Sequence, residues 1–265
     1  MNKSFILLLL VSLFWTSPVQ ARETLMVAGT GENQEVLRAL AQQFEAAHPG
    51  LTVEVPDSIG SGGGIKALKK GKTDIARTGR PLKDTEREGL VEVMFGKTPV
   101  VFATHPSVDQ VKGLTTAQLQ GIYTGKITNW KEVGGPDAKI YPISRETGDS
   151  SRIVLEASMP GIKAWTLVSK EIFTSPEAVQ TVRNNEFTIG YLSLASAHNF
   201  GLNILTLDGK SPEPDKDGKV DYPYLCPFYL VTTGKPSALA RQFIDFALSA
   251  EGRTILLAFG ALPVN

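Results

Sequence analysis

The stretch TLMVAGTGENQEVLRALAQQFEAAHPGLTVEV, residues 24–55, decides the fold. Its apolar start at 24–28 predicts a short strand that ends in a glycine-rich turn. Apolar residues then recur at intervals of three and four up to residue 47, which is the spacing of one buried helix face. His48-Pro49-Gly50 predicts the end of that helix, and the apolar 51–55 predicts a second strand. Strand, helix and strand in this order are typical of a parallel βαβ unit.

The same alternation continues to the end of the chain. Further strands are expected at 73–76, 91–95, 99–104, 140–144, 188–192, 204–207 and 224–231. Further helices are expected at 65–70, 116–123, 151–157, 176–183, 237–248 and 252–259, and the glycine-rich 57–64 is expected to be a turn. This pattern predicts an α/β protein with helices on both faces of its sheet.

The first 21 residues have the features of a secretory signal peptide. Lys3 precedes an apolar core at 5–14, and Val19-Gln20-Ala21 is a site of the type that signal peptidase cleaves. The apolar core is too short to span a bilayer, for which about 20 residues are needed. We therefore expect a cleaved signal peptide and a mature chain of 265 − 21 = 244 residues.

Charge and cysteine content narrow the class further. Without Lys3 of the signal segment, 27 − 1 = 26 basic residues face 27 acidic ones, a net charge of −1 that argues against a nucleic-acid binder. The single cysteine, Cys226, lies in an apolar run, which favours a small buried side chain over a reactive thiol. Because no cysteine follows the cleavage site, we expect an unlipidated protein of the bacterial periplasm. The three histidines have no zinc-site spacing, and no metal or cofactor is expected.

Three glycine- and hydroxyl-rich turns precede predicted helices. They are 29–32, 60–64 and 147–151, and the third follows Arg145. Glycine lets the backbone approach a ligand closely, and the free N–H groups at a helix start favour an anion. The turns predict an anion site whose donors include the hydroxyls of Thr30, Ser61, Ser150 and Ser151 and the guanidinium of Arg145.

Enzyme motifs are incomplete along the chain. Lys66 stands where a P-loop needs glycine, and Gln34 interrupts a dinucleotide-binding pattern. Ser61 follows Ile59 and not the glycine of a nucleophile elbow. These departures argue against an enzyme.

Three sequence blocks resemble the periplasmic phosphate-binding proteins of ABC phosphate importers. They are IGSGGGIKAL at 59–68 with TDIA at 73–76 and RPL at 80–82; LQGIYTGKITNW at 119–130 with GGP at 134–136; and IYPISRETGDSS at 140–151. The resemblance implies a PBP-like, type II periplasmic-binding-protein fold, α/β with two mixed sheets flanked by helices. It divides the chain into lobe one, 22–102 with 226–265, and lobe two, 103–225, joined by two crossover strands that act as a hinge.

The resemblance also implies the ligand, the partners and the site. A monomer would capture inorganic phosphate, or a related oxyanion, and deliver it to ABC transporter permease subunits. From lobe one, Thr30, Gly31, the N–H groups near Glu32 and Ser61 would meet the anion. From lobe two, Arg145, Ser150 and Ser151 would meet it. A sensor of another oxyanion or of a phosphorylated small molecule, coupled to no transporter, stays open as the alternative.

Two departures from the family pattern bear on the site. Gly79 stands where the family has an Asp that accepts the proton of bound phosphate, and Asp149 is an acid gained in the other lobe. One hypothesis is that Asp149 replaces the lost acceptor; the other is that it caps the helix beginning near Ser151. Arg80, next to Gly79, is expected to enter the cleft and add positive charge, with a surface ion pair as the alternative for both Arg80 and Arg77.

Overall fold

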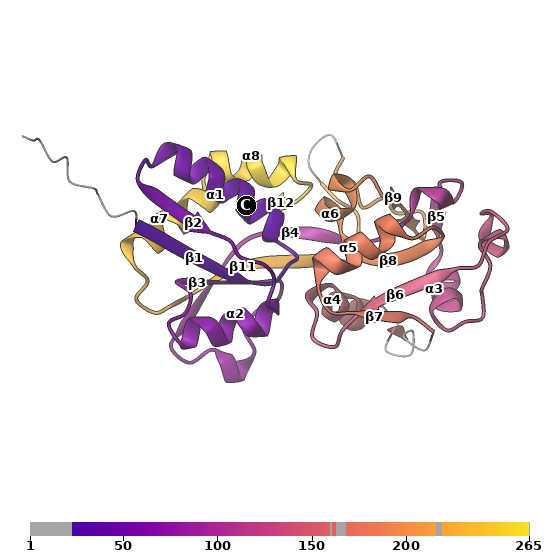
Figure 1. Cartoon of the computed structure of the whole chain (residues 1–265), viewed down its shortest axis with the longest axis horizontal. Helices are drawn as coiled ribbons and strands as arrows, with labels where there is room; N and C mark the ends of the chain where they lie inside the picture. The colour runs from indigo at the N-terminus through magenta and orange to yellow at the C-terminus, as the bar shows by residue number, and fades with distance from the viewer. Residues whose placement is uncertain (1–22, 160, 163–167, 216–218, 265) are drawn as a thin grey trace, which may run out of the picture.

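The chain folds into two lobes joined side by side by two long strands (Figure 1). A computed structural model describes residues 23–159, 161–162, 168–215 and 219–264. The predicted signal peptide lies outside these residues. Lobe one is the half that contains β1–β3 with α1, α2, α7 and α8, and lobe two is the half that contains β6–β8 with α3–α6.

The helices are α1 Gln34–Ala47, α2 Gly60–Lys69, α3 Thr116–Tyr123, α4 Ser150–Ser158, α5 Ser175–Asn184, α6 Leu194–Asn199, α7 Ala238–Leu248 and α8 Ala250–Ala258. The strands are β1 Glu23–Gly29, β2 Leu51–Glu54, β3 Ile75–Thr78, β4 Leu90–Thr104, β5 Gly113–Leu114, β6 Tyr141–Arg145, β7 Lys170–Ile172, β8 Thr188–Ser193, β9 Asn203–Ile204, β10 Thr206–Leu207, β11 Leu225–Thr233 and β12 Leu262–Pro263.

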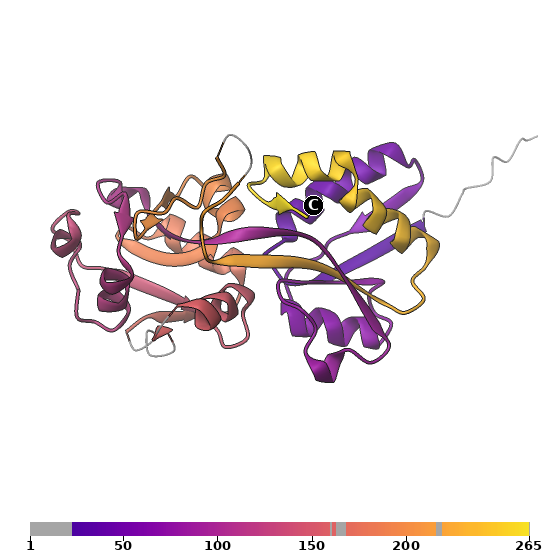
Figure 2. The same cartoon turned by 180° about the vertical axis from the view of Figure 1, so that it is seen from behind.

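One sheet path, β2-β1-β3-β11-β4-β8-β6-β7, runs through both lobes. Its two ends are parallel: β1 pairs with β2 and β3, and β6 pairs with β7 and β8. The middle is antiparallel, because β11 runs opposite to both β3 and β4. Seen from behind, β4 and β11 cross the junction side by side (Figure 2). The α/β class with a mixed sheet is confirmed, and the two crossover strands hydrogen-bond the expected two sheets into one path.

Strand β4 replaces two strands expected on either side of residues 96–98. Up to Pro99 it pairs with β11, and from Val100 onward it pairs with β8. Pro99 therefore stands where the strand changes partners, a place that tolerates a residue without an N–H donor. The resemblance-based boundaries at 102/103 and 225/226 fall within β4 and at the start of β11, and the exact lobe division stays a prediction.

The glycine run at 60–64 is the first turn of α2, so the prediction of a turn there is wrong. A Cβ on Gly64 would lie 2.8 Å from the carbonyl oxygen of Ala28 and from the Cα of Gly29. The helix therefore packs against the end of β1 at a distance that only glycine permits. This close packing outweighs the low helix propensity of glycine, which costs about 1 kcal/mol per residue relative to alanine.

Each lobe has its own apolar core. In lobe one, α1 and α7 cover the sheet with residues such as Leu37, Phe44 and Phe243. In lobe two, Phe102 and Trp130 belong to a large cluster on one side, and the other side packs beneath α5 and α6. The lobes are thus separately stabilised, and the polar side chains between them need not hold the fold together.

Candidate anion-binding site

Four helices begin where the lobes meet: α1 and α2 from lobe one, α4 and α5 from lobe two. Their first residues touch across the junction, because Ser61 Oγ lies 3.1 Å from Ser150 Oγ and Ser175 Oγ donates to Glu32 Oε1 at 3.0 Å. The residues of this interlobe cluster are all buried: Thr30, Gly31, Glu32, Ser61, Arg145, Asp149, Ser150, Ser151 and Ser175. The first N–H groups of a helix lack partners within the helix and carry its positive dipole end. Four such ends make the junction a site for negative charge.

Arg145 is the fixed cation of the cluster. It ends β6, and its Nη2 pairs with Asp149 Oδ2 at 2.9 Å. Its Nη1 donates to Ser175 Oγ at 2.9 Å and lies 3.5 Å from Glu32 Oε1. Burial alone would lower the pKa of the guanidinium, but the carboxylates of Asp149, Glu32 and Glu146 outweigh burial and raise it. Arg145 is therefore charged at every physiological pH.

The net charge of the cluster depends on whether the buried carboxyl groups of Glu32 and Asp149 are protonated. Burial, and secondly the charge of Asp149, raise the pKa of Glu32 to about 7 against the opposing effects of Arg145, Ser175 and Ser151. Burial also raises the pKa of Asp149, against the effect of Arg145 and of nearby N–H groups. With both carboxyls ionised, the side chains of Glu32, Asp149 and Arg145 sum to −1. An incoming anion is thus favoured by the helix ends and opposed by this excess charge.

Asp149 is the N-cap of α4. Its Oδ1 accepts from the N–H of Arg152 at 2.9 Å, and its Oδ2 holds Arg145. The hypothesis that Asp149 caps the helix is confirmed, and a ligand role for its side chain stays a prediction. Both of its oxygens are already engaged.

The loop at 29–33 is shaped by a buried arginine beneath it. Arg77 donates to the carbonyl oxygens of Thr30 at 2.7 Å, Val27 at 2.6 Å and Pro56 at 2.7 Å, and to Gln34 Oε1 at 2.9 Å. A Cβ on Gly31 would lie 3.0 Å from Ser175 Cβ, so this position allows the close approach of α5. Arg77 is fully buried, and the alternative of a surface ion pair is wrong for it.

Arg80 does not join the cluster. Its guanidinium pairs with both carboxylate oxygens of Glu86, at 2.7 and 2.8 Å, and with the carbonyl oxygen of Pro81. Glu86 lies only six residues further on, in the 3-10 turn Asp84–Glu86, and satisfies the charge locally. Of the two alternatives for Arg80, the structure places it in the ion pair.

Gly79 packs tightly against the start of α4 in the other lobe. A Cβ there would lie 2.5 Å from Ser150 Cβ and Oγ and 3.1 Å from Cys226 Sγ. An acid at this position would therefore collide with α4. Cys226 is buried and donates from Sγ to the Gly79 carbonyl at 3.1 Å, and the prediction of a small buried side chain is confirmed.

Two features of the site are missing from the sequence-based prediction. The sequence marks Ser175 only as a residue at a helix start, and Glu32 only through its N–H group and its effect on the helix dipole. In the structure, their side chains bond to each other across the junction. Thr174-Ser175-Pro176 carries a signal, because it is a fourth hydroxyl-bearing helix start; Thr174 already supplies the cap, which leaves Ser175 free for another role.

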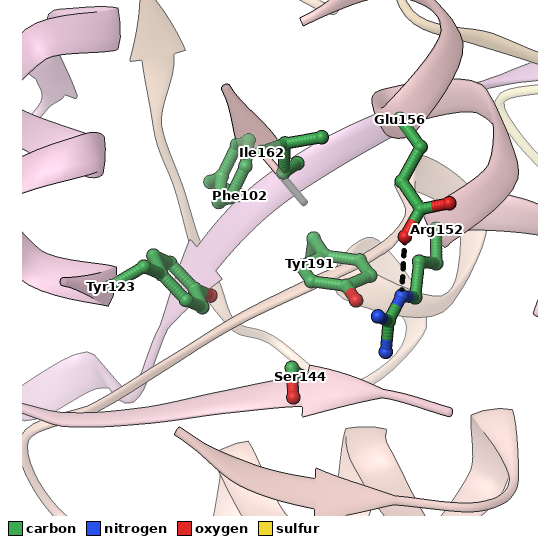
Figure 3. A pocket seen from close by; sticks show the side chains of 7 residues that line it. All are labelled: Phe102, Tyr123, Ser144, Arg152, Glu156, Ile162 and Tyr191. Atoms are coloured by element: carbon green, nitrogen blue, oxygen red, sulfur yellow. Dashed lines mark hydrogen bonds and ion pairs between the residues drawn. The ribbon is translucent and has the colours of Figure 1, made fainter. Parts of the chain in front are cut away.

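A small cavity of lobe two supports the site from its own side of the junction (Figure 3). Tyr191 lines it, and the Tyr191 hydroxyl accepts a hydrogen bond from the backbone N–H of Arg145 at 2.8 Å. Arg152 and Glu156 close one edge as an ion pair of 2.8 Å. The cavity walls therefore position the end of β6, and with it Arg145.

Comparison with known proteins identifies the family. The model of the PBP superfamily domain matches residues 16–251. A phosphate-binding protein PstS of Borreliella burgdorferi is 30% identical over 230 residues, which cover 79% of each chain. This chain belongs to the PstS-like phosphate-binding proteins of the PBP superfamily.

Further relatives agree with the PstS-like assignment. PstS of Bacillus subtilis is 26% identical over 93% of this chain and 82% of its own. The structure of a substrate-binding protein assigned to a phosphate ABC transporter of Clostridium perfringens, solved with bound phosphate, is 32% identical. Its TM-score is 0.79, and the match covers 92% of this chain and all of that one. In the described part of this chain, no helix has both the length and the apolar character of a membrane span.

Proposed function

We propose that this protein captures inorganic phosphate between its lobes and delivers it to the permease of an ABC importer. The observation that carries the proposal is the meeting of four helix N-termini at the lobe junction, together with the buried Arg145 and serines from both lobes. The names of the relatives and the phosphate in the Clostridium perfringens structure support the same ligand.

The donors of the cluster suffice for tight binding. A micromolar site needs about −8 kcal/mol, and a hydrogen bond to a charged group contributes about 1.5–3 kcal/mol. Arg145, the hydroxyls of Thr30, Ser61, Ser150 and Ser151, and the N–H groups of the helix starts supply enough such bonds to offset the cost of association. Ser175 adds a further hydroxyl between the lobes.

The remaining assignments are part of the same proposal. The protein is a binding protein and not an enzyme, its leader is cleaved after Ala21, and it works unlipidated in the periplasm. The lobes, divided at 102/103 and 225/226, close on the ligand by bending β4 and β11. Direct contacts between the lobes, such as Ser61 to Ser150, support a closed form of this kind.

Calorimetric titration of the ligand-stripped protein with phosphate tests the proposal. We expect micromolar or tighter binding at pH 6 and at pH 8. Loaded protein should then stimulate ATP hydrolysis by its permease in vesicles, and ligand-free protein should not. Heat with another oxyanion and none with phosphate would contradict the proposal and favour the alternative ligand class.

A further inference from the structure

We infer that Glu32 is the specificity-determining residue of this site: its carboxylate accepts the proton of a hydrogen-carrying oxyanion and repels an oxyanion that has none. The inference rests on the proposed function and names the group that separates phosphate from sulfate. It assigns to lobe one, at the start of α1, the role for which Asp149 was a candidate.

The two oxygens of the Glu32 carboxylate have different surroundings. Oε1 accepts from Ser175 and faces Arg145. Oε2 is buried and has no hydrogen-bond partner among the described residues. An unpaired carboxylate oxygen in a buried site is destabilising, so a ligand O–H that donates to it would be favoured.

Ser151 supplies a second unpaired group at the same junction. Its Oγ is fully buried and likewise lacks a partner in the described part of the chain, yet it lies near enough to act on the Glu32 carboxyl. Glu32 offers an acceptor from lobe one, and Ser151 offers a donor from lobe two. A tetrahedral anion that carries one proton satisfies both at once, because it has an O–H and several acceptor oxygens.

Asp149 does not compete for this role. One of its oxygens caps α4 and the other pairs with Arg145, and the N–H groups of Ser150 and Ser151 also act on this carboxyl, so Asp149 has less free acceptor capacity than Glu32 Oε2. The charged and titratable groups that act on Glu32 are Arg145 at the end of β6, Asp149 before α4 and Cys226 on β11. Glu146 faces Arg145, and Arg77 lies beneath the loop, bonded to the Thr30 carbonyl. Burial raises the pKa of the Cys226 thiol far above neutrality, so it stays uncharged.

Phosphate and sulfate differ at this point in one chemical property. Inorganic phosphate loses its last proton only in strongly alkaline solution, so it carries at least one O–H group throughout the range from pH 6 to pH 9. Sulfate keeps none, so ionised Glu32 meets it with charge repulsion and no hydrogen bond. When Glu32 is itself protonated, it can donate to sulfate. Because sulfate has one charge state over this pH range, its affinity reports on protein groups alone.

The experiment is calorimetric titration of the stripped wild-type protein with sulfate and with phosphate between pH 6 and pH 9. Since the pKa of Glu32 is about 7, sulfate affinity should fall with rising pH. The expected decrease is about tenfold per pH unit above 7, while phosphate affinity changes far less. Starting from about tenfold when Glu32 is uncharged, the discrimination should reach about 10²-fold at pH 8 and about 10³-fold at pH 9. Wild-type sulfate binding that does not change with pH would overturn the inference without recourse to any variant.

Glu32→Gln removes the charge and keeps the shape. We expect sulfate binding that is strong and independent of pH, with discrimination reduced to about tenfold or less. Glu35→Gln, at a half-exposed position in the first turn of α1, is the matched control and should behave as wild type. Discrimination that survives in Glu32→Gln and disappears in Asp149→Asn would overturn the inference in favour of Asp149. Absence of phosphate binding by the wild type would instead refute the proposed function.

Discussion

Arg77 in lobe one and Arg145 in lobe two are both buried arginines, but their surroundings are opposite. Arg77 donates only to neutral oxygens, three of them backbone carbonyls. Arg145 faces the carboxylates of Glu32, Asp149 and Glu146. Burial lowers the pKa of Arg77 to about 10, whereas the carboxylates raise that of Arg145.

The difference indicates a division of labour. The hydrogen bonds of Arg77 fix the backbone of lobe one, and all their acceptors belong to that lobe, so a ligand does not replace them. The partners of Arg145 include a side chain from the other lobe, so an incoming anion can replace or join them. A buried arginine bonded to carbonyls is thus expected to support the fold, and one bonded to carboxylates at a junction is expected to support binding.

The largest effect should come from Arg77→Met. It leaves the oxygens of Thr30, Val27, Pro56 and Gln34 without their donor in a buried region. We expect a loss of about 3–5 kcal/mol in the free energy of unfolding, measured by urea denaturation. Arg87→Met, which removes the exposed ion pairs with Asp84 and Glu92, should cost about 1 kcal/mol or less. Equal losses in the two variants would contradict the scaffold role of Arg77.

Arg145→Gln should weaken phosphate binding more than it lowers stability, the opposite of Arg77→Met. We expect phosphate affinity to fall by about 100-fold or more, because the fork of charge-assisted hydrogen bonds is lost. The free energy of unfolding should change less than in Arg77→Met, since the two carboxyl groups left behind can take up protons. Arg145→Lys keeps the charge without the planar fork and should bind with intermediate affinity. Calorimetry and urea denaturation of the same samples measure both quantities.

The pH dependence of stability should come from the carboxyl groups around Arg145, and chiefly from Glu32. Folding raises the pKa of Glu32 from 4.5 to about 7, so between these values the folded state binds more protons than the unfolded state. Stability of the ligand-free protein should therefore decrease as pH rises from 4.5 to 7 and level off above, by on the order of 3 kcal/mol. Thermal unfolding of wild type and Glu32→Gln at pH 5 and pH 8 checks this. A slope that is equally steep in the variant would assign it to other groups.

Much of the fold could be predicted from local patterns. The spacing of Val36, Leu40 and Phe44 predicted α1, and the helix predicted at 116–123 has the bounds of α3. The glycine run of α2 and the unbroken β4 could not be predicted, because both depend on tertiary contacts. Gly64 is helical since β1 lies against it, and Pro99 lies within a strand since the strand changes partners there.

In the candidate site, too, local features could be predicted and tertiary contacts could not. Backbone turns and hydroxyls were visible in the sequence, so Thr30, Ser61, Ser150 and Ser151 could be named. The directions of charged side chains were not visible. Arg80 turns to Glu86 within its own segment, whereas Glu32 reaches Ser175 at a distance of 143 residues along the chain. The sequence alone does not show whether a charged side chain bonds to a near neighbour in the chain or to a residue of the other lobe.

Gly79→Ala should give the smallest change in phosphate affinity. It tests whether anion binding by Arg145 depends on close contact between the lobes. The added Cβ would lie 2.5 Å from Ser150 and leaves both guanidinium groups in place. We expect phosphate affinity to fall by about tenfold, because overpacking at such a contact costs about 1–3 kcal/mol. Gly62→Ala, with open space around its Cβ, should instead stabilise α2 by about 0.5–1 kcal/mol. Unchanged affinity in Gly79→Ala would mean that the lobes need not approach as closely to hold the anion, and that Arg145 binds it without the Ser61–Ser150 contact.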